Sequence, residues 1–394
     1  MGLRSGTKKI TKRVGNAFGT NDLLDKINIL DINADARLDS IVGRLNELNE
    51  SLARINENLE YTHRKIDLLE SRLVETSNYN KKICELYFQA LFKKDSESDL
   101  SMRKRFFRKL PTASGDLRLL QLGNAKLLKI MHEICEKNHI QYSVCAGTLL
   151  GAIRHGGIIP WDDDVDVMMT RDNIKKFVAA IGNTNYRVTV AYDWYVMCRQ
   201  IRFRSKSVAN PCFVDIFIYD YANDNSRETW QNWQKLKTKY LQLAHDDSDN
   251  ILHEWHNNPL VFDDDGSQLS REIRNLFNKT YGDLYKPKSG GPGAVVAPDD
   301  TGGKGYKFLM WGMDNLYPVA NPDTPRIYEK GLIYPTKQIM FEGFPVMIPN
   351  NPEEILYRYY GDFYQLPDDL VSHFQHIDRA DLNIDELKKF IGEA

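Results

Sequence analysis

The chain has 394 residues, of which 52 are basic and 54 acidic, and a formal net charge of −2. This balance gives no indication of nucleic-acid binding, and no nucleic-acid partner is expected. Five cysteines without a C-x-x-C pair argue against a disulfide framework and a cysteine-rich zinc site. No stretch of about 18 apolar residues is present. The basic N-terminus lacks the apolar core of a signal peptide, so we expect a cytoplasmic protein.

A heptad repeat over 31–78 follows a basic N-terminal segment, 1–30, and predicts a coiled-coil oligomerisation helix. Its core positions alternate at spacings of three and four, and no proline interrupts them. They are Leu38, Ile41, Leu45, Leu48, Leu52, Ile55, Leu59, Thr62, Ile66, Leu69, Leu73 and Thr76. So narrow a seam needs a partner helix, which predicts a homo-oligomer. The alternative is an amphipathic helix that packs on the globular domain of the same chain.

Residues 79–110 are mixed in character and are expected to form a linker that ends in a basic run, 103–109. A second basic cluster lies in the N-terminal segment. It consists of Lys8, Lys9, Lys12 and Arg13. Basic runs of this kind are usually solvated faces. The alternative is peripheral contact of the two clusters with anionic lipid on the inner face of the cell membrane.

The remaining chain, 111–394, has the pattern of one catalytic α+β domain. Periodicity predicts elements in the order helix, strand, helix, strand, helix, strand, strand. These are expected at 117–138, 140–145, 148–154, 164–169, 171–181, 195–205 and 212–219. Such an order indicates a small mixed sheet with flanking helices. The segment 286–306 is rich in Gly and Pro and is expected to be a flexible loop.

The run from Gly147 to Met169 contains four aspartates within five residues. Strand alternation places Asp164 and Asp166 on one face, with the intervening valines in the core. Asp215, in a second strand of the same pattern, is expected to complete a site for Mg²⁺ or Mn²⁺, or to act as a general base. The alternative is a cluster of solvated acids at the ends of strands. Asp162 and Asp163 are expected in the preceding turn and are weaker candidates.

A phosphate-binding side is expected opposite these acids. Gly147 and Thr148 lie between a predicted strand and helix, where backbone N–H groups and a hydroxyl bind anions. Arg154 and His155 follow within two turns and are expected to neutralise a diphosphate. A Gly-Thr turn followed at this spacing by an Asp-x-Asp strand predicts nucleotide or phosphoryl transfer.

Three blocks of the sequence resemble the LicD family, which also includes the fukutin-type enzymes. They are 147–167, 214–219 and 334–363, within a resemblance that covers roughly 115–375. The likeness implies a nucleotidyltransferase fold of the DNA polymerase beta type. It also implies that the Gly-Thr turn holds phosphates, and that the three aspartates hold metal. The implied reaction moves a phospho-alcohol from a CDP-activated donor to a sugar hydroxyl and releases CMP.

Other residues are candidates for substrate binding. Arg202 and Arg204 share one strand face and could clamp a donor phosphate, or pair with surface acids; Arg199 lies on the other face. Glu342 and Asp362 could line the acceptor side, or Glu342 could be a structural turn acid. Aromatic residues near the motif could form a choline cage, or belong to the core. They are Trp161, Tyr192, Trp194 and Tyr195. A zinc site at His373 and His376 is the weakest candidate.

The leading hypothesis is a metal-dependent enzyme that transfers phosphocholine from CDP-choline to a bacterial cell-surface glycan, such as lipopolysaccharide, teichoic acid or capsule. The second is transfer of another CDP-linked group: glycerol phosphate, ribitol phosphate or phosphoethanolamine. The third, from a different class, is a non-catalytic coiled-coil scaffold for glycan assembly. The partners expected of the enzyme are the CDP-activated donor and the glycan acceptor.

Overall fold

The structure, a computed structural model, describes most of the chain. The described residues are 21–193, 198–222, 224–246, 305–312, 325–367 and 382–392, with 260–261, 268, 271 and 295–296 between them. The chain divides into two compact units, Met1–Phe88 and Gln89–Ala394. No helix in the described part of the chain is long and apolar enough to cross a membrane.

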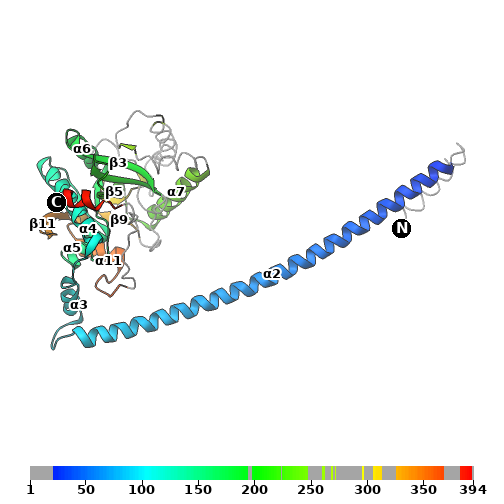
Figure 1. Ribbon diagram of the computed structural model, residues 1–394, viewed down its shortest axis with the longest axis horizontal. Coiled ribbons are helices and arrows are strands. Elements are labelled where there is room, and N and C mark those ends of the chain that lie inside the picture. Colours follow the sequence, from blue (N-terminus) through cyan, green and yellow to red (C-terminus); the bar gives the residue numbers. More distant parts are fainter. Residues whose placement is uncertain are drawn as a thin grey trace. The chain divides into compact units, whose positions relative to one another are not determined.

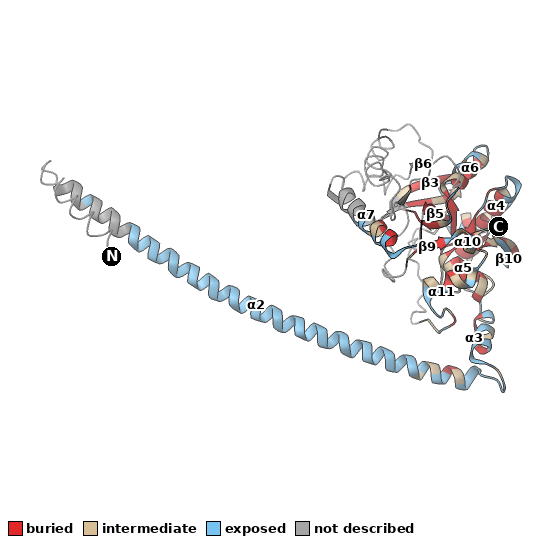
Figure 2. Cartoon of the chain, turned by 180° about the vertical axis from the view of Figure 1, so that it is seen from behind, coloured by how far each residue is buried: buried red, intermediate tan, exposed pale blue. Residues whose placement is uncertain are grey.

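The heptad region lies within one helix, α2 (Asn21–Phe92), which extends beyond the predicted 31–78 at both ends (Figure 1). Its seam is open in the single chain, since Leu45 is 53% exposed and Leu59 is 49% exposed. Figure 2 shows the same exposure along most of the described helix. A helix gains most of its stability from burying an apolar face. The partner that would cover this seam stays a prediction.

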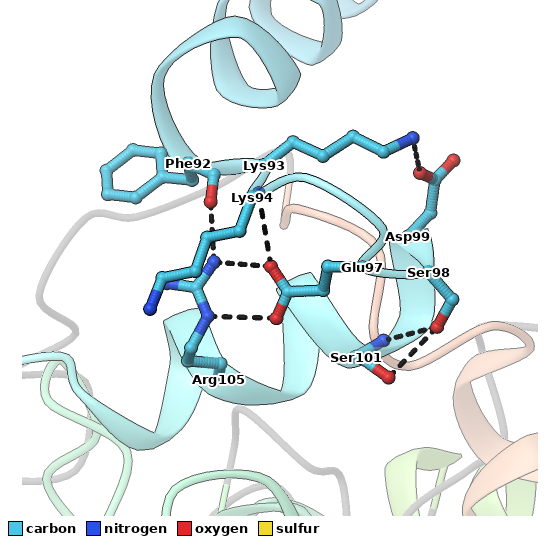
Figure 3. A network of polar contacts seen from close by, with 8 residues as sticks. All are labelled: Phe92, Lys93, Lys94, Glu97, Ser98, Asp99, Ser101 and Arg105. Carbon is cyan, nitrogen blue, oxygen red and sulfur yellow. Dashed lines mark hydrogen bonds and ion pairs between the residues drawn. The ribbon is translucent and has the colours of Figure 1, made fainter.

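The predicted linker contains a second helix, α3 (Asp99–Arg108). Its Met102 and Phe107 side chains are buried at 0% and 1% exposure, so this segment belongs to the core of the second unit. The preceding turn is fixed by Arg105, whose guanidinium binds both carboxylate oxygens of Glu97, at 2.9 and 2.7 Å (Figure 3). The Ser98 hydroxyl caps α3 by accepting from the amide of Ser101.

These contacts reduce the charge that the basic run, 103–109, presents to solvent. Arg105 is paired with Glu97, and Arg103 lies 3.4 Å from a carboxylate oxygen of Asp362. Arg108 donates to the backbone carbonyl of Ile153. The exposed basic side chains of the run, Lys104, Arg108 and Lys109, are therefore the ones best placed to meet lipid.

A mixed sheet forms the centre of the second unit, in the order β1-β2-β5-β4-β3-β6 (Figure 1). Its strands are β1 (Ser143–Val144), β2 (Asp166–Thr170), β3 (Tyr186–Asp193), β4 (Cys198–Ser205), β5 (Phe213–Ala222) and β6 (Leu260–Val261). β2 and β5 are parallel, whereas their other pairings are antiparallel. The predicted α+β class with a mixed sheet is confirmed. β7 (Val295–Val296) and β8 (Phe308–Trp311) also pair with β5, and β9 (Ile327–Glu329) pairs with β8.

Helices and a hairpin surround this sheet. The helices are α4 (Gly115–Lys137), α5 (Ala146–Arg154), α6 (Arg171–Ile181), α7 (Arg227–Asp246), α10 (Lys330–Ile333), α11 (Pro352–Tyr360) and α12 (Ile384–Ile391). β10 (Lys337–Phe341) and β11 (Phe344–Ile348) form the hairpin. The predicted loop 286–306 lies outside the described residues, apart from β7 and residues 305–306.

Strand alternation separates the two faces of the sheet. Phe203 on β4 packs against Phe177 of α6, with 5.0 Å between the ring centroids. The neighbouring Arg202 and Arg204 point to the opposite face. All ten residues of β5 are buried, so each carboxylate that this strand carries requires a partner. Asp220 has one in Arg171, which donates two hydrogen bonds, and Asp215 is part of the candidate site.

Candidate functional site

Three aspartates converge at the start of the parallel pair β2–β5. Asp166 is directly opposite Asp215 in the register of these strands. Asp164 precedes β2, and one carboxylate oxygen from each of the three residues lies within 4.8 Å of the others. They are buried at 8%, 7% and 2% exposure for Asp164, Asp166 and Asp215. The structure thus brings together acids that are some fifty positions apart, as the strand pattern predicted.

Backbone hydrogen bonds hold this group in place. The amide of Asp215 donates to the carbonyl of Val165, 2.9 Å away, so the strand pairing continues one residue ahead of β2. The amide of Asp166 donates to the side-chain hydroxyl of Thr148, 2.7 Å away. Val165 and Val167 are fully buried beneath the acids. The carboxylates therefore project from a rigid backbone, which is required of a preorganised metal site.

Two buried amide side chains of α4 position the turn before β2. Asn124 donates to the carbonyl of Asp163, 2.9 Å away, and accepts from the amide of Phe213 at the start of β5. Gln121 donates to the carbonyls of Ile159 and Asp162. Sequence reasoning missed both residues. The available signal was two amides three positions apart on the apolar face of a helix.

The electrostatics of the group favour a bound cation. Burial, together with the carboxylates of Asp164 and Asp215, raises the pKa of Asp166 well above its ordinary value. Arg202 partly opposes this shift, and its Nε–H donates to Oδ1 of Asp215 at 2.8 Å. The nearby Cys145 thiol is buried, and its pKa is raised well above the ordinary range. A hard divalent cation with oxygen ligands fits this donor set, because it would relieve the repulsion between the carboxylates.

Asp162 and Asp163 lie in irregular backbone before β2, as predicted. One oxygen of each, with one of Asp164, forms a second cluster within 4.8 Å. The Asp162 carboxylate lies against the first turn of α5, where a Cβ at Gly147 would be 2.7 Å from Oδ2. Glycine at 147 therefore allows an acid to approach the helix N-terminus, where its negative charge is favourable.

The predicted phosphate side is only partly supported. Gly147 and Thr148 lie in the first turn of α5, as expected. The Thr148 hydroxyl, however, already accepts a hydrogen bond from Asp166, so its structural role is to hold the acid-bearing strand. In addition, Asp162 lies against Gly147, where an anion was expected. Anion binding by this turn stays a prediction.

Arg154 and His155 do not have the predicted role of binding a diphosphate, because both side chains pack within the domain. Arg154 is 5% exposed, donates to the carbonyl of Phe363 and lies 4.3 Å from the Phe107 ring centroid. Burial, with the charges of Arg154 and Arg108, lowers the pKa of His155 to about 3. The imidazole is therefore neutral near pH 7, and it cannot neutralise a diphosphate. The end of α5 is instead part of the packing between α3 and the C-terminal segment.

Trp161 packs against the core, with its ring centroid 5.9 Å from that of His155. The choline cage stays a prediction: the side chain of Tyr192 is not described, and Trp194 and Tyr195 lie outside the described residues. His373 and His376 lie outside it as well.

Glu342 occupies the β10–β11 turn, where its φ of +50° places it in the left-handed region. Arg118 binds its two carboxylate oxygens at 3.3 and 2.7 Å, and the amide of Ile158 donates to it at 2.9 Å. These contacts favour the structural alternative, in which Glu342 fixes the segment that leads to the aspartates. Asp362 is bound to Arg103 of α3 and to the amide of Tyr364.

Arg202 and Arg204 do lie beside the acids. Arg202 is opposite Asp215 and Arg204 is opposite Phe213 in the β4–β5 register. Arg202 makes the ion pair with Asp215, and both guanidinium groups lie over the Phe213 ring, at 4.1 and 5.6 Å from its centroid. One of the two predicted clamp residues is thus engaged by an acid of the site.

The sequence of the chain is similar to those of known proteins. Residues 139–248 match the family described as LicD/FKTN/FKRP, nucleotidyltransferase domain. The chain is 29% identical over 287 residues to the lipopolysaccharide cholinephosphotransferase LicD of Haemophilus influenzae, over 67% of this chain and 97% of that protein.

Two uncharacterized rickettsial proteins match over shorter stretches. RP689 of Rickettsia prowazekii is 38% identical over 96 residues, which are 24% of this chain and 32% of that protein. RT0683 of Rickettsia typhi is 54% identical over 102 residues, or 25% of this chain and 29% of that protein. The region that matches the LicD/FKTN/FKRP family, 139–248, contains the three aspartates together with strands β2 and β5.

Proposed function

We propose that the chain is a metal-dependent transferase that moves phosphocholine from CDP-choline to a hydroxyl of a bacterial cell-surface glycan. The observation that carries the proposal is the buried group of Asp164, Asp166 and Asp215, with carboxylate oxygens within 4.8 Å of one another. This group lies in a region that matches a cholinephosphotransferase over nearly that protein's whole length. The parallel acid-bearing strands β2 and β5 also support the proposed nucleotidyltransferase-like fold.

The reaction would break one bond and form one bond at phosphorus. The acceptor hydroxyl oxygen attacks the phosphorus that bears choline, the bond to the oxygen of CMP breaks, and CMP leaves with its electron pair. The hydroxyl proton passes to a carboxylate of the site. We assign this role to Asp215, because its ion pair with Arg202 fixes its position.

Asp164, Asp166 and Asp215 would hold Mg²⁺ or Mn²⁺, which supplies positive charge for the diphosphate and the departing nucleotide. The chain's own residues hold this arrangement. Thr148 and Asn124 fix the backbone on either side of Asp164. The apolar face beneath the acids keeps water away from that side.

A donor screen tests the proposal. Purified protein would be incubated with a lipopolysaccharide acceptor and CDP-choline, CDP-ethanolamine, CDP-glycerol or CDP-ribitol, in Mg²⁺, in Mn²⁺ or in EDTA. We expect metal-dependent CMP release and choline incorporation with CDP-choline. Consumption of a non-choline donor alone would overturn the choline assignment. It would instead indicate transfer of another CDP-activated phospho-alcohol.

Variants make the screen specific to the site. Asp164→Asn, Asp166→Asn and Asp215→Asn should each lower the rate by roughly 100-fold or more. Asp95→Asn, at an exposed turn residue, is the matched control and should keep the wild-type rate. Full activity of Asp164→Asn would refute the metal assignment.

We further propose that the transferase self-associates through α2 and works at the inner face of the cell membrane. The exposed heptad seam supports the first proposal. The exposed Lys104 of α3 and Lys109 just after it support the second, whereas Arg103 and Arg105 are paired with acids within the chain.

A further inference from the structure

A row of arginines extends from the aspartates across the sheet. Arg202 on β4 is opposite Asp215 on β5, and Arg204, two residues along, is opposite Phe213. On the other side of β4, Arg187 of β3 is directly opposite Arg204. Directly opposed residues of antiparallel strands project to the same face, so Arg187, Arg202 and Arg204 share the face of the acids. We call these three residues the arginine row.

Among the described residues, Arg187 and Arg204 at the far end of the row have no acidic partner. The Nε atoms of Arg187 and Arg204 are buried and have no hydrogen-bond partner. Among the described residues, no carboxylate lies within salt-bridge distance of either guanidinium. Burial, and then the charges of Arg202 and Arg187, lower the pKa of Arg204 to about 10. The Arg204 side chain therefore stays charged at neutral pH, at a cost to stability.

The row is held in a defined geometry despite this repulsion. The guanidinium of Arg202 lies 4.1 Å from the centroid of the Phe213 ring, and that of Arg204 lies 5.6 Å away. Each of the three arginines is only partly buried, so part of each side chain remains accessible from solvent. Stacked arginines lose little further freedom on binding, because the aromatic ring and the strand pairing already restrict them.

We propose that Arg187 and Arg204, together with Arg202, form an anionic subsite that binds a phosphate group of a substrate reacting at the aspartates. The subsite rests on the proposed function for its reaction. It is distinct from the helix turn at Gly147–Thr148, because it lies on the opposite side of Asp215, on β3 and β4. A phosphate fits because several guanidinium groups can donate to its oxygens, and because its charge would relieve their repulsion.

Two sources of this phosphate are compatible with the position of the row. One is the diphosphate of the nucleotide-activated donor, bound partly by the aspartate side and partly by the arginine side. The other is a phosphate already present on the glycan acceptor. The chemistry of recognition is shared, so the experiment has an arm for each.

The test uses full-length Arg187→Met and Arg204→Met, with Arg204→Lys as the conservative variant. Lys206→Met, at an exposed residue just beyond β4, is the control for lost positive charge. Calorimetry would measure binding of inorganic pyrophosphate and of CMP, in EDTA and in Mg²⁺, and scanning fluorimetry would give the Tm of ligand-free protein. We expect about ten- to hundredfold weaker pyrophosphate binding in both Met variants, with partial recovery in Arg204→Lys.

The stability measurement separates binding from a structural role. Removing an unpaired buried charge should leave the ligand-free Tm unchanged or raise it, whereas loss of a structural arginine would lower it. A lower Tm together with unchanged pyrophosphate affinity would overturn the proposal. So would equal affinities of wild type, Arg187→Met and Arg204→Met.

Steady-state kinetics distinguishes whether the bound phosphate belongs to the donor or to the acceptor. If the donor supplies the phosphate, the variants should raise KM for CDP-choline about tenfold or more with an unphosphorylated acceptor. If the acceptor supplies it, they should raise KM only for phosphorylated glycan. Pyrophosphate binding that depends on the row in a protein inactive with every CDP donor would refute the proposed function alone. Choline transfer with unaltered pyrophosphate binding in the variants would refute the subsite alone.

Discussion

The backbone amide of Asp166 donates a hydrogen bond to the side-chain hydroxyl of Thr148, with 2.7 Å between the two atoms. The contact joins the first turn of α5 to the first residue of β2, and both groups are buried. Because the amide nitrogen is bonded to the Cα that carries the Asp166 side chain, the hydroxyl holds the backbone from which that acid projects. The Gly-Thr turn thus has a structural function in the acid site.

Thr148→Val tests this function. The isosteric valine leaves the Asp166 amide buried without an acceptor, which should cost about 1–3 kcal/mol of unfolding free energy. We expect kcat to fall as well, because the carboxylate loses its fixed position. Urea unfolding and transfer kinetics would measure both. Thr148→Ser keeps the oxygen and is the control; equal behaviour of the Val and Ser variants would contradict this role.

Replacing Asn124, which lies outside the acid site, should likewise lower both stability and the transfer rate. Asn124→Ala removes the acceptor of the Phe213 amide and the donor to the Asp163 carbonyl at once. We expect a loss of roughly 2–4 kcal/mol in stability, and slower transfer in the protein that remains folded. Lys129→Ala, an exposed position on the same helix, should leave both unchanged. A destabilised Asn124→Ala protein with wild-type kcat would show that Asn124 supports the fold but not the acids.

Much of the domain could be predicted from the sequence, because its signals are local. The alternation around Asp164 and Asp166 predicted their shared face, and the same pattern at Asp215 predicted the third acid. The contacts that hold the site could not be predicted in this way. Asn124 meets partners 39 and 89 positions away, and Arg118 meets Glu342 at a separation of 224. Such pairs depend on the packing of α4 against the turn and the hairpin.

The predicted roles of Arg154 and His155 show the same limit. Their charge and spacing after the Gly-Thr turn indicated a phosphate, but sequence does not report burial. The last turn of α5 directs both side chains against Phe107. Arg187 was missed for a related reason, since only the register of β3 with β4 brings it beside Arg204.

His155 should make the protein sensitive to acid. Its pKa is lowered from 6.5 to about 3 in the folded state, mainly by burial. Below pH 6.5 the unfolded chain therefore binds a proton that the folded chain does not, and stability falls as the pH drops toward 3. His155→Phe should reduce this loss when urea unfolding is compared at about pH 7.5 and about pH 5. His63→Phe, at an exposed residue, is the control and should lose as much stability between the two pH values as wild type does. An equal loss in His155→Phe would show that His155 does not cause the acid sensitivity.

In metal-free protein, Asp166 should make stability depend on pH in the opposite direction to His155. Its pKa is raised, so between the ordinary value of 3.8 and the raised one the folded chain binds the extra proton. Stability then falls as the pH rises through this window, and the penalty is fully present above it. Asp166→Asn should raise the Tm in EDTA at neutral pH, whereas added Mg²⁺ or Mn²⁺ should stabilise wild type more than the variant. A Tm that is lower than wild type in EDTA would contradict the repulsion argument.

The seam of α2 gives a prediction that does not depend on the chemistry. Leu52 and Leu59 are exposed at 49% each, and their heptad spacing would place each against its counterpart in a partner helix. Leu52→Lys/Leu59→Lys would bury four or more like charges in that interface, so sedimentation equilibrium should show the mass of one chain. Glu57→Lys adds a lysine to the same helix outside the seam and should keep the oligomer. Choline transfer per chain should persist in both, because the aspartates and the arginine row all lie in the second unit. If the double variant and Glu57→Lys have the same mass, the seam does not mediate self-association.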